Sequence, residues 1–252
     1  MQRILFKIFS IVKPLVFYFI RIIYKDHYYV AEKNLNKTVL LVCNGPSLNK
    51  VNLEKFKKIH SYGLNKIHLI YHRTTWRPTS IVVSNGLVIR QLKRIIKQNP
   101  DKYILDEKSK LFLKHSAKIF KSNTNTFQEN YDSDFITLGA SVSVCALQII
   151  LKSKPKNVII VGLDHNFKLP NSQNPNKIEI HQGNDENHFS KDYFKDKYWG
   201  VPDLKNENYQ LKCLKELADS LNINIVDATI GGNLNVFPKI NIEEAYKMVE
   251  TS

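Results

Sequence analysis

The run Val39-Leu40-Leu41-Val42-Cys43-Asn44-Gly45-Pro46-Ser47-Leu48 indicates the fold class more clearly than any other part of the chain. Its first four residues are apolar without interruption, which is typical of a parallel strand buried on both faces. Pro46 cannot continue a strand, and Ser47 can cap a following helix. A strand that turns tightly into a helix directs backbone N–H groups above the sheet edge, where a nucleotide phosphate can bind. An ordinary strand-to-helix turn explains the same residues, because they form neither a G-x-G-x-x-G nor a Walker motif.

The rest of the chain alternates short apolar runs with amphipathic ones. Runs that predict strands cover residues 67–71, 80–84, 103–105, 158–161 and 223–226, and runs that predict helices cover 52–59, 87–98, 137–151 and 204–221. This alternation predicts an α/β fold of modified Rossmann type, with a mostly parallel sheet and helices on both faces. The polar segment at about 165–203 is too long for a simple connection, so we expect a lid there. Residues 31–252 are expected to form a single α/β domain.

Composition limits the classes of function. A hydrophobic content of 43% in 252 residues excludes a disordered protein. The net charge of +14 favours anionic partners, although a general enrichment in lysine explains the same value. The three cysteines form no C-x-x-C pair, which predicts reduced thiols in the cytoplasm and no zinc site.

Residues 1–30 differ from the rest, because apolar, aromatic and basic residues alternate with no acidic residue before Asp26. The uninterrupted apolar piece from Pro14 to Ile20 is far shorter than the roughly 20 residues of a spanning helix. The segment also lacks the small-residue cleavage site of a signal peptide. We therefore expect a basic amphipathic segment that associates with a membrane surface; a helix packed on the domain's own core is the alternative.

Polar and glycine-containing segments are expected to meet at the carboxyl edge of the sheet. They are Asn44 to Ser47, Gly63-Leu64-Asn65, Gly139-Ala140-Ser141 and Gly162-Leu163-Asp164. Asp164 suits a ribose hydroxyl or a base edge, or else it caps a turn. His188, in the predicted lid, suits general-base work, although a single loop histidine is more often a solvated surface residue.

The order of these motifs resembles bacterial sialyltransferases of the small type that modifies capsules and lipooligosaccharides. The resemblance rests on Asn-Gly-Pro-Ser-Leu (44–48), Gly-Leu-Asn (63–65), Thr-Leu-Gly-Ala-Ser-Val (137–142), Val-Gly-Leu-Asp (161–164) and the lid histidine. Residues 187–194 and 227–238 are also similar to a broader family, which contains flagellin-modifying transferases and the archaeal hydroxymethylpterin pyrophosphokinase.

This resemblance implies a nucleotide-sugar-binding domain that uses a cytidine monophosphate (CMP) sugar as donor substrate, with no cofactor and no obligatory metal. By matching motifs, the site residues would be Asn44, Gly45, Pro46, Ser47 and Asn65 around the donor phosphate and sugar, Gly139, Ala140 and Ser141 beside the nucleotide, Gly162 and Asp164 at the cytidine, His188 as general base, and Tyr193. The sialyltransferases have tyrosines soon after the aspartate that stabilise the leaving phosphate. Here that segment is His165-Asn166-Phe167-Lys168, so Tyr193, Lys168 or His165 would have to substitute.

The expected function is transfer of an acidic sugar, such as a nonulosonate, from its CMP donor to a surface glycan or a lipid-linked acceptor. We expect the chain to act in the cytoplasm, peripherally on the inner face of the cytoplasmic membrane. Expected partners are the donor, the acceptor and an anionic membrane surface, with no nucleic acid and with homo-oligomerisation left open.

Two other functions remain open from the sequence. A pterin pyrophosphokinase would require carboxylates such as Asp164 with Asp132 or Asp134 to converge on magnesium. We interpret Asp132-Ser133-Asp134, which superficially matches an Asp-x-Asp metal motif, as a turn instead. Charge alone suggests a non-enzymatic nucleic-acid binder, which the motifs do not support.

Overall fold

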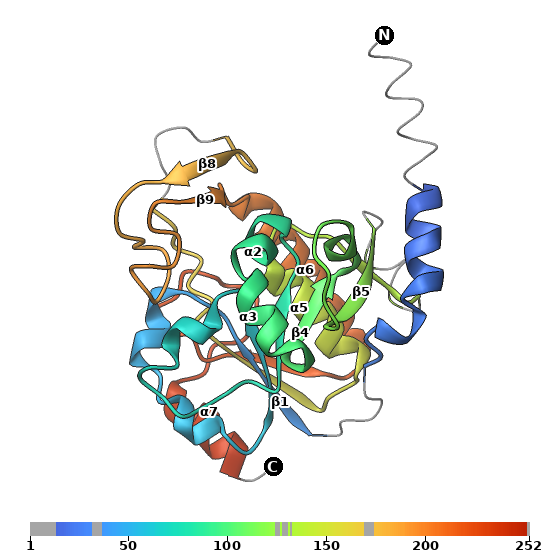
Figure 1. The fold of residues 1–252 in the computed structure, drawn as a ribbon. Coiled ribbons are helices and arrows are strands. Elements are labelled where there is room, and N and C mark those ends of the chain that lie inside the picture. The colour runs from blue at the N-terminus through green and yellow to red at the C-terminus, as the bar shows by residue number, and fades with distance from the viewer. Residues whose placement is uncertain are drawn as a thin grey trace.

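The computed structural model describes residues 14–31, 37–123, 127, 131, 133–168 and 174–250. Within them, eight parallel strands form one sheet in the order β10-β7-β1-β2-β3-β4-β5-β6 (Figure 1). The strands are β1 (Thr38–Val42), β2 (His60–Leu64), β3 (Ser80–Val83), β4 (Tyr103–Asp106), β5 (Lys118–Asn123), β6 (Phe135–Thr137), β7 (Asn157–Val161) and β10 (Asn224–Asp227). An antiparallel hairpin of β8 (Ile178–His181) and β9 (Lys197–Gly200) stands apart from this sheet.

Helices cover both faces of the sheet, and each face has its own apolar core (Figure 1). Alternate residues of β1 divide between them: Leu40 and Val42 enter one core, and Val39 and Leu41 enter the other. The second core is covered by α5 (Val142–Lys152) and α6 (Leu204–Ser220). The first is covered by α2 (Gly86–Gln91), α3 (Lys93–Gln98), α7 (Ile242–Glu250) and the 3-10 helices η2 (Pro46–Lys50), η3 (Leu53–Phe56) and η4 (Ile67–Ile70). The predicted parallel α/β architecture is therefore confirmed.

Several predicted elements differ in the structure. Residues 67–71 form the 3-10 helix η4 instead of a strand, because Ile67 and Ile70 are buried at a helical spacing of three. The strand lies earlier, at β2, where Gly63 leaves room for the Ile67 side chain. The predicted helix 87–98 is broken at Leu92, and the helix predicted from Thr137 begins only at Val142, because Thr137 pairs in β6. Helix α7 lies C-terminal to every element predicted from the sequence.

The N-terminal part of the described chain is a helix over residues 14–23, followed by η1 (Lys25–His27). Its link to the sheet is a parallel bridge from Tyr28 to Ile119. Residues 1–13 of the predicted membrane segment lie outside the described residues, as does Asp132. Among the helices of the described residues, none is both long enough and apolar enough to cross a bilayer.

Candidate active site

A pocket of about 650 Å³ lies at the carboxyl edge of the sheet, where β1 and β7 run side by side. The chain leaves β1 towards β2 and leaves β7 towards β10, in opposite directions, so this is the topological switch point of the sheet. Ligands of open α/β sheets bind at such points, and the volume is typical of a small-molecule site. The lining includes Asn44 after β1 and Gly162 after β7.

The structure brings together all but two of the site residues that the sequence predicts. Those that line the pocket are Asn44, Gly45, Asn65, Gly139, Ala140, Ser141, Gly162, Asp164, His188 and Tyr193. Pro46 and Ser47 belong to η2 and do not line the pocket.

Ser47 instead holds the two loops of the switch point together. Its backbone N–H donates to Oδ1 of Asp164 over 3.0 Å and its hydroxyl donates to Oδ2 over 2.6 Å. Burial raises the pKa of Asp164, and these two hydrogen bonds oppose the rise. A Cβ on Gly45 would come 1.9 Å from Oδ2 of Asp164, so only glycine fits beside this clamp. The capping role of Asp164 is thus realised, at a position that also faces the pocket.

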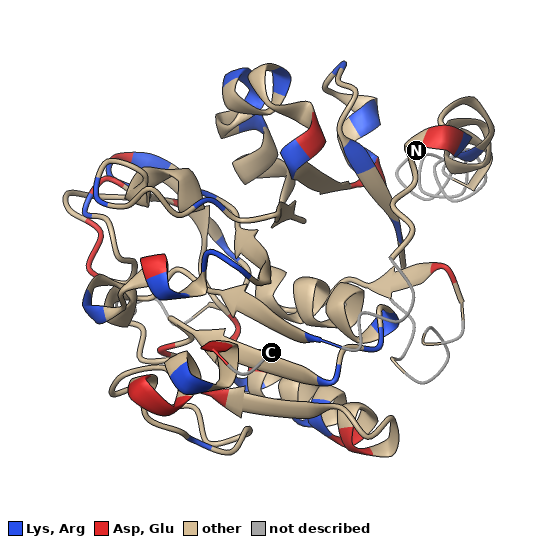
Figure 2. Ribbon diagram, turned by 90° about the horizontal axis from the view of Figure 1, so that it is seen from below, with Lys and Arg blue, Asp and Glu red and all other residues tan. Residues whose placement is uncertain are grey.

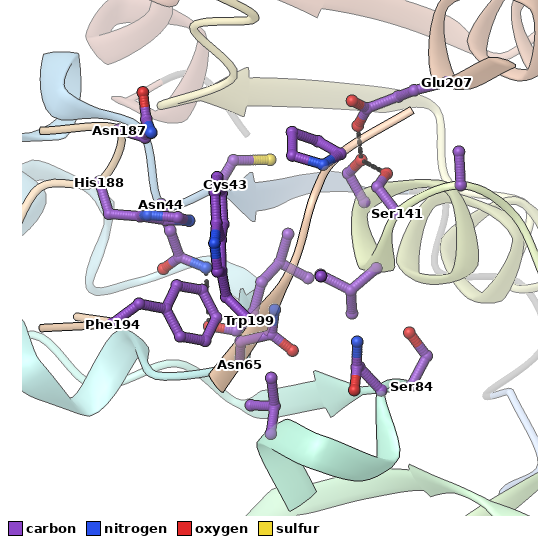
Figure 3. Close-up of a pocket in the computed structure, with 18 of the residues that line it drawn as sticks. Cys43, Asn44, Asn65, Ser84, Ser141, Asn187, His188, Phe194, Trp199 and Glu207 are labelled. Carbon is purple, nitrogen blue, oxygen red and sulfur yellow. Dashed lines mark hydrogen bonds between the residues drawn. The ribbon is translucent and has the colours of Figure 1, made fainter. Parts of the chain in front are cut away.

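His188 forms a pair with Asp185 on one wall of the pocket. Its Nδ1 lies 2.9 Å from Oδ2 of Asp185, and its ring lies beside Asn44 (Figure 3). Asp185 is buried and also accepts hydrogen bonds from the N–H groups of Asn187 and Phe194. Burial raises the pKa of Asp185, but the hydrogen bond and charge of His188 outweigh it and leave the pKa below its ordinary value. A carboxylate on Nδ1 orients a histidine so that Nε2 can take a proton.

Aromatic rings fix the plane of the His188 imidazole. It stacks on Tyr193 with 4.0 Å between centroids, and Phe194 packs against it edge-on at 5.4 Å. The Tyr193 hydroxyl accepts a hydrogen bond from the backbone N–H of Lys66 over 3.3 Å, and burial raises its pKa. Tyr193 therefore serves as a platform for the histidine, with its hydroxyl already engaged.

Lys66 is a buried cation directly behind this wall. Its ammonium donates to the carbonyl of Tyr193 over 2.5 Å and lies 4.2 Å from the ring centre of Phe194. Within the described chain it has no carboxylate partner at ion-pair distance. Burial, together with the charge of Lys197, lowers the pKa of Lys66 to about 7. A buried lysine without an anionic partner favours the neutral form.

Polar atoms without partners lie in the pocket wall. The amide nitrogen of Asn44 donates to the carbonyl of Leu64 over 3.0 Å, which fixes the amide orientation, because a carbonyl can only accept. Oδ1 of Asn44 is then left buried without a partner among the described residues, as are Oδ1 of Asn65 and Nε1 of Trp199. Unsatisfied buried groups cost about 1–3 kcal/mol each, and ligand hydrogen bonds would recover that cost.

The opposite wall carries a second polar cluster, at the start of α5 and α6. The Ser141 and Ser143 hydroxyls lie 2.5 Å apart, and Ser143 donates to Oε1 of the buried Glu207 over 2.8 Å (Figure 3). Oε2 of Glu207 lies 3.7 Å from Nε2 of His165. This nitrogen atom is buried and has no hydrogen-bond partner in the described chain. A Cβ on Gly139 would come 2.5 Å from Gln210, so this glycine is required by packing.

Three residues of the candidate site escaped the sequence analysis. Asp185 precedes His188 by three residues, a spacing that signals a pair only once the loop geometry is known. Trp199 comes from β9 of the β8–β9 hairpin and Glu207 from α6, and no local motif links them to the strand ends.

The structure does not bring Asp164 and Asp134, the two described acidic residues of the magnesium hypothesis, together. Asp134 is exposed and pairs with Lys121 over 3.1 Å just before β6, at the amino edge of the sheet. Asp164 follows β7, six strand positions away, or about 29 Å at roughly 4.8 Å per strand. Across the described residues, no three His, Cys, Asp or Glu side chains gather into a cluster suited to a metal ion.

No protein-family model and no curated protein matches this chain. Among solved structures, it is similar to the MAf glycosyltransferase from Magnetospirillum magneticum AMB-1, with a TM-score of 0.51 and 12% identity. That match covers 89% of this chain, which spans about two fifths (39%) of the other protein. A short-chain dehydrogenase from Oenococcus oeni PSU-1 matches 86% of this chain and 90% of its own at 9% identity, but a TM-score of 0.21 is too low to indicate a shared architecture. The first comparison shows a common fold.

Proposed function

We propose that this protein is a glycosyltransferase that moves an acidic sugar, such as a nonulosonate, from a CMP donor to a hydroxyl acceptor. The observation that carries the proposal is the pair of His188 and Asp185, which faces a pocket at the switch point of a parallel sheet. The shared fold with a solved glycosyltransferase and the order of the sequence motifs support it.

In the proposed reaction, Nε2 of His188 removes the proton of the acceptor hydroxyl as its oxygen attacks the anomeric carbon. The bond from that carbon to the phosphate oxygen breaks, and CMP leaves with the electron pair. The imidazolium that forms is stabilised by Asp185 and later releases its proton to solvent. A single base with direct attack gives inversion at the anomeric carbon. Burial beneath the lid hairpin limits hydrolysis of the donor by water.

The polar atoms that have no hydrogen-bond partner in the described chain indicate which groups can contact the donor. Oδ1 of Asn44 is an acceptor, so it suits a sugar hydroxyl better than a phosphate. Lys168 is exposed and paired with Glu186, and the Tyr193 hydroxyl is engaged. Nε2 of His165 and Nε1 of Trp199 lack partners among the described residues, and we assign them as donors to the leaving phosphate.

We place the reaction at the inner face of the cytoplasmic membrane, on a surface glycan or lipid-linked acceptor. The helix of residues 14–23 supports this, because Leu15, Tyr18, Phe19, Ile22 and Ile23 are each more than half exposed. Its other side packs on the domain through Ile20 and Arg21, as the alternative of a helix packed on the domain's own core expects.

Neither alternative function gains a supporting observation at the pocket. The pyrophosphokinase hypothesis needs Asp164 together with Asp132 or Asp134; Asp164 and Asp134 lie at opposite edges of the sheet, and Asp132 lies outside the described residues. The nucleic-acid hypothesis rests on net charge, and Arg90 is the single lysine or arginine among the described residues that line the pocket.

Ligand-dependent thermal unfolding and a transfer assay test the proposal. CMP at 100 times its Kd should stabilise the fold by about 2.7 kcal/mol, whereas ATP should have no effect. His188→Ala should lower transfer by about 10²–10⁴-fold while CMP still binds. His72→Ala, an exposed histidine outside the pocket, is the matched control. Stabilisation by ATP alone, or full transfer by His188→Ala, would refute the proposal.

A further inference from the structure

Half of the net charge of this protein lies in one short part of the chain. Residues 90–121 hold ten lysines or arginines and three acidic residues, a charge of +7 out of +14. Of the three acidic residues, Asp106 and Glu107 are buried, so Asp101 alone opposes the cations at the surface of this segment. The exposed cations are Arg90, Lys93, Arg94, Lys97, Lys102, Lys114 and Lys118. We call the surface of residues 90–121 the basic face.

The N-terminal helix is attached to this basic face. Arg21 donates twice to the buried Glu107, over 2.7 and 3.1 Å, and the Tyr28 hydroxyl donates to the same carboxylate over 2.7 Å. The ammonium of Lys110 lies over the Tyr24 ring, and Lys118 donates to the carbonyl of Asp26. Figure 2 shows lysines and arginines in blue on the elements next to the N-terminal helix, which lies near the N label.

The helix turns an apolar stripe away from the domain. Leu15, Tyr18, Phe19, Ile22 and Ile23 follow the spacing i, i+3, i+4, i+7, i+8, which places them on one side of a helix. Contiguous exposed apolar side chains of this size mark an interaction surface. A stripe of Phe, Tyr, Leu and Ile bordered by cations has the chemistry of an interfacial helix on an anionic bilayer.

We propose that the stripe and the basic face together form one docking surface for an anionic lipid bilayer. This inference rests on the membrane location proposed above, which used the N-terminal segment alone, and it adds the folded domain as a second attachment surface. The two signals are complementary, since apolar insertion or polybasic attraction alone gives weak, reversible binding.

The basic face also adjoins the opening of the pocket. Arg90 and Phe112 belong to the basic face and line the pocket, and the guanidinium of Arg90 lies 4.3 Å from the centre of the Phe112 ring. A bilayer on the basic face would therefore lie next to the pocket rim, where a lipid-linked acceptor can enter.

Sedimentation of the full chain with vesicles tests the inference, using phosphatidylcholine alone and phosphatidylcholine with 30% phosphatidylglycerol. We expect binding to the anionic vesicles only, reversed by 0.5 M salt. The triple variant Lys93→Gln, Arg94→Gln, Lys97→Gln should lower the partition coefficient roughly a hundredfold, at about fivefold per cation. The double variant Phe19→Ser, Ile23→Ser should lower it at least about tenfold.

A matched control removes the same charge elsewhere: Lys58→Gln, Lys156→Gln, Lys212→Gln changes three exposed lysines outside the basic face. It should change the partition coefficient by less than about threefold. Equal losses in the two triple variants, equal binding to neutral and anionic vesicles, or a dimer in solution that the stripe variant dissociates without losing vesicle binding would each overturn the inference. These measurements involve no CMP, so they succeed or fail independently of the proposed reaction.

Discussion

The carboxylate of Asp185 holds Nδ1 of His188 at 2.9 Å while accepting two backbone hydrogen bonds from its own loop. The segment of residues 185–194 thus folds around its own aspartate, and His188 is one of the groups that this aspartate holds in place. The stacked Tyr193 below the imidazole leaves it one orientation. This arrangement makes the orientation of His188 depend on a single buried carboxylate.

We expect Asp185→Asn to lower sugar transfer by at least about tenfold, because the imidazolium loses its stabilising charge. CMP affinity should stay within about twofold, since Asp185 is absent from the pocket lining. Initial rates of transfer and calorimetric titration with CMP provide the two measurements. Unchanged transfer in a folded Asp185→Asn protein would show that His188 is not the base.

Gly45→Ala should destabilise the fold by about 1–3 kcal/mol, because its methyl group would sit 1.9 Å from the Asp164 carboxylate that clamps the switch point. The backbone of Gly45 has φ −67°, so the steric contact alone is responsible. Gly200→Ala in β9 is the control, since nothing lies within 4 Å of a Cβ there. Urea unfolding measures the stability of both variants. Equal unfolding midpoints would show that the contact between Gly45 and Asp164 does not constrain the fold.

Lys66 should make the stability rise with pH above neutrality. Burial lowers its pKa from 10.5 to about 7, so between these values the unfolded chain holds a proton that the folded chain lacks. The free energy of unfolding should therefore increase by up to about 1.4 kcal/mol per pH unit from pH 7 to 10. His68 beside it has its pKa lowered to about 4, chiefly by burial, so it does not titrate in this window.

Lys66→Met should flatten this pH profile, whereas Lys58→Met, at an exposed position, should leave it unchanged. Urea unfolding at four pH values between 7 and 10 measures the slope. An equal slope in wild type and Lys66→Met would show that Lys66 keeps its proton when folded.

Glu207→Gln should weaken CMP binding by about tenfold, because His165 loses the carboxylate oxygen that lies 3.7 Å from its Nε2 and helps to orient its ring. Glu216→Gln, exposed on the same helix α6, should bind CMP like the wild type. Titration calorimetry measures the CMP affinity of the two variants. Equal affinities would place the phosphate away from His165.

The sequence by itself determined the parallel sheet and most of the pocket. Uninterrupted apolar runs such as Val39 to Val42 are buried whatever surrounds them, and the polar residues that follow such strands meet at the carboxyl edge of the sheet. Asn44, Asn65 and Asp164 were found for this reason. The strand predicted at residues 67–71 was wrong, because a 3-10 helix can bury the same isoleucines as a strand.

Only the tertiary structure decided the working geometry of the site. Asp185 on His188, Glu207 beside His165 and Ser47 on Asp164 are contacts between side chains whose orientation depends on loop conformation. Ser47–Asp164 and Glu207–His165 join segments distant in sequence, and the Asp185–His188 pair, three residues apart, depends on the conformation of its loop. Residue spacing along the chain therefore does not predict these contacts. The same holds for the N-terminal helix: its apolar periodicity was readable, but the Arg21–Glu107 pair, 86 residues apart, fixed which face stays exposed.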